Sequence, residues 1–151
     1  MRISAKADYA VRAALELAAA PGPPIKAEQV AEAQGIPLKF LENILVDLRQ
    51  HGLVTSQRGP AGGYRLDGRP EEITVADVVR AVDGPLASIH GDRPEATEYP
   101  GPAAELQTVW VALRASMRVV LEGVTLADLV ERSVSDEVLR LAREPDAWMR
   151  R

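Results

Sequence analysis

The chain of 151 residues is 46% hydrophobic but only 4% aromatic, so it can bury a core made mostly of Ala, Leu and Val. It contains no cysteine, which excludes disulfides and thiolate redox chemistry and is compatible with the cytoplasmic location that we expect. No apolar run reaches the length of a membrane span, and Met1 leads directly into an amphipathic pattern, so we expect neither membrane insertion nor a signal peptide.

The net charge of −4 is unevenly divided along the chain. Residues 1–69 hold 9 Lys and Arg against 7 Asp and Glu, whereas residues 70–151 hold 9 against 15. A positive first part suits contact with nucleic acid, and the acidic remainder does not. This division is a weak argument by itself, because many acidic proteins with two such parts bind no nucleic acid.

The first 35 residues predict two helices joined by a stiff loop. Ser4 is a suitable N-cap for a helix over residues 5–20, which the Pro- and Gly-rich residues 21–24 end. A shorter helix is expected over residues 25–34. Lys6 on the first helix is a cation that either contacts a DNA phosphate or is simply solvated, and the sequence leaves both open.

A third helix followed by a hairpin is predicted over residues 36–66. Pro37 fits the first turn, Gly52 ends the helix, and its apolar residues recur at three- and four-residue steps. The apolar face consists of Leu38, Leu41, Ile44, Leu45 and Leu48. Strands are expected over residues 53–56 and 64–66, on either side of a glycine-rich turn that carries Arg58. Two helices and such a hairpin are typical of a winged helix-turn-helix, whose second helix enters a major groove.

The second half predicts more helices separated by a long loop. A fourth helix over residues 71–82 has Thr74 as N-cap with Asp77 three residues on, and residues 83–102 form a loop rich in Pro and Gly. A long helix over residues 103–123 carries an apolar stripe. The stripe consists of Leu106, Val109, Trp110, Leu113, Met117, Val120, Leu121 and Val124.

Two short helices are predicted to close the chain. Thr125 with Asp128 caps the first, over residues 126–132, and Ser133 with Asp136 caps the second, over residues 137–144. The tail from residue 146 to 151 is expected to be frayed, with Trp148 available to dock on a partner chain.

The helix-and-hairpin stretch resembles the IscR/NsrR/CymR type of bacterial transcription regulators. Their pattern IP-x-x-[YF]-LE, then LR-x-x-GLV-x-S-x-RGP-x-GGY-x-L, is present as IPLKFLE and LRQHGLVTSQRGPAGGYRL. The segments MRISAKADYAVRAALELA, EEITVADVVRAVDG and VTLADLV extend the resemblance over roughly the first 130 residues. It implies a mainly α fold with a small β-wing. The expected parts are a winged helix-turn-helix head at 1–84, an effector-type loop at 85–102, and a dimerisation helix with C-terminal helices at 103–151.

The resemblance implies that the third helix and the wing read promoter DNA. The predicted DNA-binding residues are Lys6, Pro37, Lys39, Phe40, Glu42, Asn43, Arg58, Gly59 and Arg65. Arg58 suits a narrow minor groove, whose negative potential attracts arginine. Lys39 stands where some members have a small hydroxyl residue, which should change sequence preference. Phe40 matches an aromatic residue that borders the DNA backbone, although packing within the head is the favoured alternative.

The resemblance also implies a homodimer, in which the long helix crosses its symmetry mate. The predicted interface is Leu106, Val109, Trp110, Leu113, Met117 and Leu121. The alternative is a helix that packs only within its own chain. The stripe favours the dimer because it is long enough to cover more than the small head.

No cofactor is expected. Cluster-bearing relatives hold iron–sulfur with three cysteines in a loop that matches residues 91–106 here, and this chain has no thiolate to offer. His90, Asp92, Glu95 and Glu98 are interpreted as a solvated loop rather than as metal ligands. Asp8 matches a ligand position of an unusual relative, but we interpret it as an acid at a helix N-terminus.

The sequence contains no enzyme signature, neither a phosphate-binding glycine loop nor a nucleophile elbow nor a paired-histidine metal motif. We therefore expect a sequence-specific DNA-binding regulator, with repression favoured, that acts as a homodimer on a palindromic operator. Its effector would be a small molecule or a partner protein. The alternative is a winged-helix protein-interaction module that has lost DNA binding, and Lys39, Arg58 and Arg65 favour the first reading.

Overall fold

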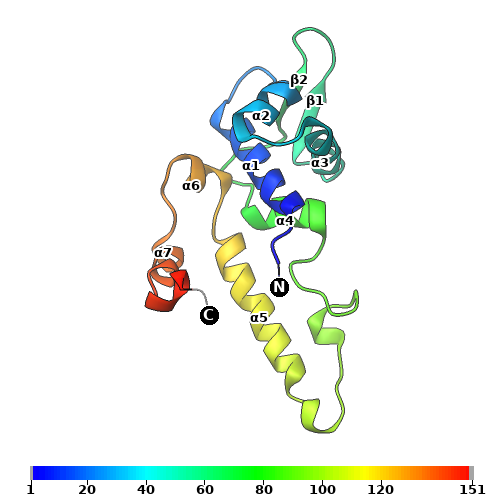
Figure 1. The fold of residues 1–151 in the computed structure, drawn as a ribbon, viewed down its shortest axis with the longest axis vertical. Coiled ribbons are helices and arrows are strands. Elements are labelled where there is room, and N and C mark those ends of the chain that lie inside the picture. Colours follow the sequence, from blue (N-terminus) through cyan, green and yellow to red (C-terminus); the bar gives the residue numbers. More distant parts are fainter. Residues whose placement is uncertain (1, 150–151) are drawn as a thin grey trace.

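A helical head stands on one end of a long helix in the computed structural model, which describes residues 2–149 (Figure 1). The head contains α1 (Ala5–Ala19), α2 (Ala27–Gln34), α3 (Leu38–Gln50), β1 (Val54–Gln57), β2 (Gly63–Leu66) and α4 (Val75–Asp83). The remainder contains the 3-10 turns η1 (Pro94–Ala96) and η2 (Gly101–Ala103), then α5 (Leu106–Glu122), α6 (Leu126–Val130), α7 (Asp136–Ala142) and η3 (Pro145–Trp148). The predicted fold class, mainly α with a small β-wing, is confirmed.

The core of the head lies between α1 and α3. The buried face of α1 is made almost wholly of alanine, so neighbouring helices approach its backbone closely. The larger side chains come from α3, where Leu41, Ile44, Leu45 and Leu48 are completely buried. Leu38 was predicted to share this face, but it is 37% exposed, because it lies at the first residue of the helix, on the rim of the core.

The end of α3 is fixed by its backbone. Gly52 adopts a left-handed φ of 71°, the Leu53 amide donates to the Leu48 carbonyl at 2.9 Å, and the Gly52 amide donates to the Arg49 carbonyl at 3.1 Å. These two bonds satisfy carbonyls that the helix leaves unpaired, and they send the chain directly into β1. The prediction that Gly52 closes this helix is confirmed.

The wing is an antiparallel hairpin in which Val54 pairs with Leu66 and Gln57 with Gly63. A third segment joins it, because the Ile25 and Tyr64 backbones exchange hydrogen bonds of 2.8 and 2.7 Å. Ile25 was predicted to begin the second helix. That prediction was wrong, since its backbone is committed to the wing and α2 begins at Ala27.

Two adjacent capping boxes attach α6 to the head. Thr74 and Asp77 cap α4, and Thr125 and Asp128 cap α6, as predicted. The Thr125 amide donates to the Asp128 carboxylate at 2.8 Å, and this bond holds the pKa of Asp128 below its usual value. The predicted start of α4 at residue 71 was wrong, because residues 71–73 form a turn that places Thr74 at the cap.

The core extends across the predicted division of the chain. Leu126 of α6 is completely buried in the same core as α1, although it belongs to the segment that we assigned to the dimerisation part. The loop over residues 84–105 is also more structured than expected. It contains η1, η2 and an isolated bridge between Ile89 and Asp92.

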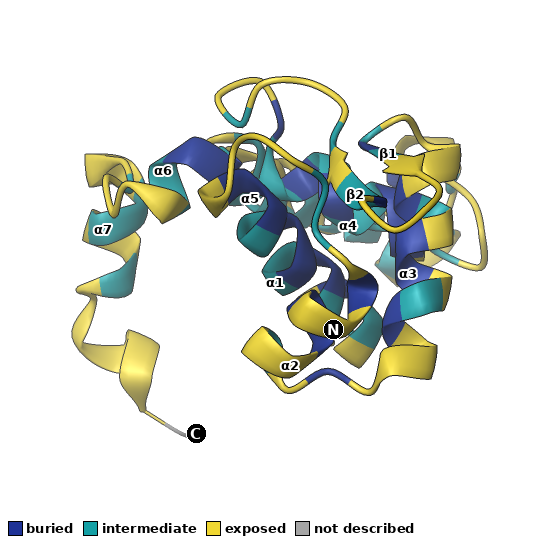
Figure 2. Cartoon of the chain, turned by 90° about the horizontal axis from the view of Figure 1, so that it is seen from above, coloured by how far each residue is buried: buried dark blue, intermediate teal, exposed yellow. Residues whose placement is uncertain are grey.

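The C-terminal segment stands apart from the head, as Figures 1 and 2 both show, and α7 contains no buried residue. Ser135 is its N-cap, so the predicted cap at Ser133 was wrong. The predicted fraying was wrong for residues 146–148, which belong to η3 (Pro145–Trp148), and the Trp148 indole donates to the Ala142 carbonyl at 2.6 Å. Trp148 is nevertheless 82% exposed, so docking on a partner stays a prediction, and residues 150 and 151 lie outside the described part.

Gly63 provides a test of the junction between the wing and the head. A Cβ at this position would lie 2.4 Å from the Ile25 carbonyl oxygen, and the φ of 150° is itself unfavourable for other residues. Gly63→Ala should lower the free energy of unfolding by about 3 kcal/mol in urea titrations. Gly22→Ala is the matched control, because φ is 135° there but a Cβ would meet nothing within 4 Å. Equal losses in the two variants would contradict the steric account.

Candidate nucleic-acid interface

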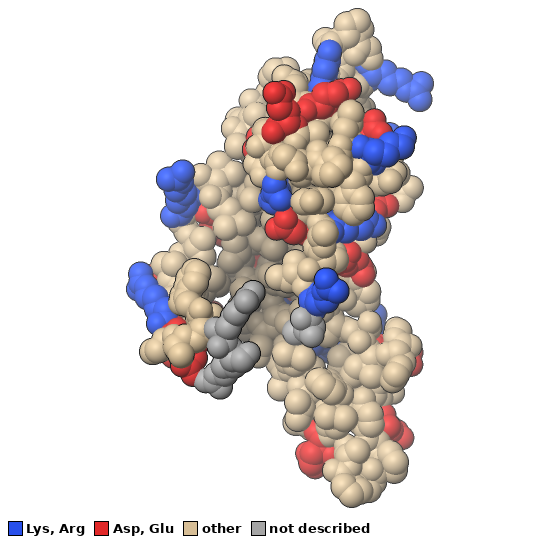
Figure 3. Space-filling view, viewed as in Figure 1, with Lys and Arg blue, Asp and Glu red and all other residues tan. Residues whose placement is uncertain are grey.

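The basic side chains of the head project near the wing. Figure 3 shows blue side chains interspersed with red ones at this end of the molecule, whereas the charged side chains visible at the far tip, near the start of α5, are red. The wing and the far tip lie at opposite ends of the long axis (Figure 1).

The outer face of α3 is free to meet a ligand. Burial of the opposite face fixes the rotation of the helix about its axis, and this leaves Pro37, Lys39 and Asn43 exposed. The Lys39 side chain is 92% exposed, and its ammonium lies 3.6 Å from the Glu42 carboxylate. An exposed pair of this kind is weakly bound, so both groups can exchange partners readily.

A groove of about 460 Å³ joins α3 to the wing and to the start of α2. It is lined by Lys26, Ala27, Glu28, Glu42, Arg49, Ser56, Gln57, Arg58, Gly59, Gly62, Gly63 and Tyr64. The fold thus brings the predicted residues Glu42, Arg58 and Gly59 to one surface. Sequence reasoning missed Lys26 and Arg49, although Arg49 follows Glu42 by seven residues and so shares its helix face.

One hydrogen bond joins the wing to α3, and another joins its two strands. The Arg49 guanidinium donates to the Ser56 hydroxyl at 3.1 Å, which ties α3 to β1. Arg65 lies opposite Thr55 in the hairpin register and donates to its hydroxyl at 3.4 Å. Arg58 at the tip is exposed and has no hydrogen-bond or ion-pair partner among residues 2–149, so its donors remain available.

Phe40 and Lys6 have contacts within the head. The Phe40 ring meets Tyr9 edge-on, with ring centroids 5.6 Å apart, yet it stays 41% exposed. The Lys6 ammonium lies 2.7 Å from the Asp47 carboxylate and donates to the Val82 carbonyl at 3.0 Å. Phe40 thus packs within the head, and Lys6 connects α1 to α3 and α4. Contact of either side chain with DNA stays a prediction.

The apolar stripe of α5 is turned largely toward its own chain. Leu106, Trp110 and Leu113 line a cavity of about 660 Å³ beneath the loop that follows α4, and Met117 and Leu121 line another against α1 and α4. No residue of α5 is fully buried. Of the six predicted interface residues, only Val109 points to the open side of the helix.

A second stripe of α5 is open to solvent. Val109 and Val119 are 54% and 45% exposed, and Ala112 and Ser116 lie between them on the same face. Small and β-branched side chains at three- and four-residue steps allow a second helix to approach closely. This face, the open face of α5, offers a surface for another chain.

The chain offers no cysteine thiolate, the usual ligand of an iron–sulfur cluster, since none of its 151 residues is cysteine. Among residues 2–149, no three His, Asp or Glu side chains come together as a metal site. His90 lies in the lining of the apolar cavity beside α5, and Glu95 pairs with Arg114. Asp8 lies in the first turn of α1 and pairs with Arg12 at 3.1 Å, which agrees with its interpretation as a helix N-terminal acid. Within the described part, no helix is both long and apolar enough to cross a bilayer.

Comparison with known proteins agrees with this geometry. The Rrf2 family model, described as an iron-dependent transcriptional regulator, matches residues 3–132. An HTH-type transcriptional regulator of Mycobacterium tuberculosis is 52% identical over 147 residues, covering 94% of this chain and 89% of the relative. IscR of Aliivibrio salmonicida is 36% identical over 143 residues, covering 94% and 83%. The structure of CymR from Bacillus subtilis, the global cysteine regulator of that organism, superposes with a TM-score of 0.74 at 32% identity, covering 87% of this chain and 98% of CymR. The chain therefore belongs to the Rrf2 family of helix-turn-helix transcriptional regulators.

Proposed function

We propose that this protein is a sequence-specific DNA-binding regulator that acts as a homodimer on a two-fold symmetric operator, as a repressor and without an iron–sulfur cluster. One observation carries the proposal: Glu42 and Arg49 of α3 border the same groove as the unpaired Arg58 of the wing. A helix and a basic hairpin on one rigid surface fit the major groove and the neighbouring minor groove of one DNA duplex.

Each part of this surface has a distinct task. Lys39, Glu42 and Asn43 lie on the exposed side of α3, where side chains reach base edges and phosphates of a major groove. Arg58 and Arg65 lie on the wing, where arginine suits the narrow minor groove. Lys26 and Arg49 border the groove between helix and wing and add positive charge near the phosphate backbone.

The dimer brings two such surfaces onto one duplex. A monomer would leave the open face of α5 in water, whereas a two-fold pairing of this face buries it and fixes the distance between the two recognition helices. The second head then binds at a high effective concentration once the first is bound. A dimer seated on a promoter would exclude the transcription machinery, which is the basis for proposing repression.

Arg58→Ala should weaken binding to the specific operator by about 1–3 kcal/mol, because the arginine would lose its contacts in the groove. Lys39→Ala should instead change the preference among bases at one position of each half-site. Fluorescence anisotropy at several salt concentrations measures both effects. Arg140→Ala on α7 is the control and should leave affinity unchanged. Equal weakening by Arg58→Ala on specific and random duplexes, with a flatter salt dependence, would replace the groove contact by a phosphate contact.

Val119→Asp should reduce dimer association by about a hundredfold, because it places a charge in a desolvated seam on the open face of α5. Operator binding should fall with it, although Val119 lies far from the wing. Val130→Asp on α6 is a matched control, since Val130 is 39% exposed and undergoes the same change. Analytical ultracentrifugation with an operator titration decides the point. A wild-type chain that is monomeric at micromolar concentration and still binds its operator fully would refute the dimer.

The protein purified anaerobically should be colourless and contain no stoichiometric iron or sulfide, because it lacks the thiolates that hold such clusters. Its operator affinity should be the same in reducing and in mildly oxidising buffer. Metal analysis and visible absorption spectra test this expectation. A cluster absorption band with iron in proportion to protein would contradict it.

A further inference from the structure

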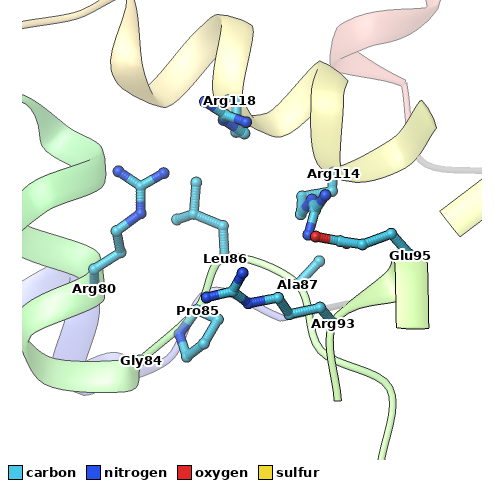
Figure 4. Close-up of a pocket in the computed structure, with 9 residues that line it drawn as sticks. All are labelled: Arg80, Gly84, Pro85, Leu86, Ala87, Arg93, Glu95, Arg114 and Arg118. Carbon is cyan, nitrogen blue, oxygen red and sulfur yellow. The ribbon is translucent and has the colours of Figure 1, made fainter. Parts of the chain in front are cut away.

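A pocket of about 530 Å³ lies between the end of α4, the loop that follows it and the middle of α5 (Figure 4). Its walls are Arg80, Gly84, Pro85, Leu86, Ala87, Arg93, Glu95, Arg114 and Arg118. Four arginines from three separate segments thus line one space, and Figure 4 shows their guanidinium groups around the Leu86 side chain. The pocket is distinct from the DNA-facing groove, with which it shares no residue.

The pocket is positively charged, although the part of the chain that forms it, residues 70–151, is acidic overall. Residues 70–151 hold 9 Lys and Arg against 15 Asp and Glu, yet four of those nine cations line this pocket. Only one of the lining residues, Glu95, is acidic. An arrangement of this kind attracts anions, and it does so more strongly where side chains are withdrawn from water. Arg114 is such a side chain, with 22% of its surface exposed.

The carboxylates nearby satisfy only part of this charge. Arg114 lies 2.5 Å from Glu95, and Glu122 pairs with both Arg80 and Arg118, at 3.0 Å from the latter. Arg80 also lies 3.8 Å from the Asp77 carboxylate. Hydrogen bonds from Arg114 to Glu95 hold the pKa of that carboxyl below its usual value, and those from Arg80 and then Arg118 do the same for Glu122.

Arg93, the remaining arginine of the pocket, makes no ion pair among residues 2–149. A guanidinium group presents a planar fork of donors that matches carboxylate or phosphate oxygens two at a time. Four such groups against three paired carboxylates leave donors unmatched. A ligand must compete with these carboxylates, which favours one that carries more than one negative charge.

We propose that this pocket binds a small anion bearing at least two carboxylate or phosphate groups, and that this anion is the effector of the protein. The loop that contributes Arg93 and Glu95 is the segment in which cluster-bearing relatives are expected to hold iron–sulfur. In this chain the segment supplies cations instead of thiolates. The regulatory part of this inference rests on the proposed DNA-binding function, whereas anion binding itself does not.

The pocket is connected to the recognition helix through the end of α4. Arg80 lies in the last turn of α4, and the Val82 carbonyl just beyond it accepts a hydrogen bond from Lys6 at 3.0 Å. Lys6 in turn pairs with Asp47 of α3 at 2.7 Å. An anion that draws Arg80 from Glu122 would shift the end of α4, and this chain of contacts would transmit the shift to α3.

Isothermal titration calorimetry of the full chain without DNA tests the site. Pyrophosphate, citrate and acetate serve as separate probes. Pyrophosphate or citrate should bind with one site per chain, and acetate should not bind at millimolar concentration. Arg93→Gln should weaken binding at least about tenfold, because the Arg93 guanidinium makes no ion pair or side-chain hydrogen bond among residues 2–149 and so supplies unmatched donors. Arg140→Gln removes a charge from α7, outside the pocket, and should have no effect.

Two results would overturn the site: no binding of either multivalent probe below about 1 mM, or equal weakening in Arg93→Gln and Arg140→Gln. Unchanged thermal unfolding of Arg93→Gln would show that any loss of binding does not reflect a loss of fold. Operator titrations with the bound probe then test the coupling, which requires a change in wild-type affinity that Arg93→Gln abolishes. If the anion binds but operator affinity does not change, the binding site stands and its regulatory role is rejected. Absence of operator binding under all conditions would instead reject the proposed function.

Discussion

The structure depends on the burial of one face of α3 against the alanine face of α1. Leu41, Ile44, Leu45 and Leu48 are all completely buried, so α3 cannot rotate about its axis without exposing large apolar surface to water. The small residues of α1 bring α3, α4 and α6 close to one central helix. As a result, the polar side of α3 is presented in a single orientation, and the wing follows it within a few residues.

The wing is held by a backbone bridge and by a side-chain hydrogen bond, whereas no residue of α5 is fully buried. The bridge between Ile25 and Tyr64 and the bond from Arg49 to Ser56 keep the hairpin beside α3. By contrast, α5 projects from the head with every residue at least partly exposed (Figures 1 and 2). The head holds α3 and the wing in fixed positions, and α5 is incompletely buried by its own chain. Both features are compatible with the proposed homodimer.

Helix faces, helix ends and the wing were predictable because each depends on a local sequence pattern. The face of α3, the Gly52 ending and the capping boxes at Thr74 and Thr125 all depend on residues within one turn of one another. The wing was predictable from the glycine-rich turn between two short strands. At the start of α4 the capping motif and the apolar pattern indicated different boundaries. The helix begins where the capping motif places it.

Contacts between distant residues could not be read from the sequence. The bridge of Ile25 to the wing, the pairing of Lys6 with Asp47 and the gathering of arginines around Leu86 each join segments that share no local pattern. The apolar stripe of α5 was found by its spacing, but spacing does not say which neighbour covers it. Selection of bound sequences from random DNA duplexes tests the central claim most directly. The account predicts a two-fold symmetric motif whose half-sites are centred about one helical turn apart, and recovery of only single or asymmetric half-sites would contradict it.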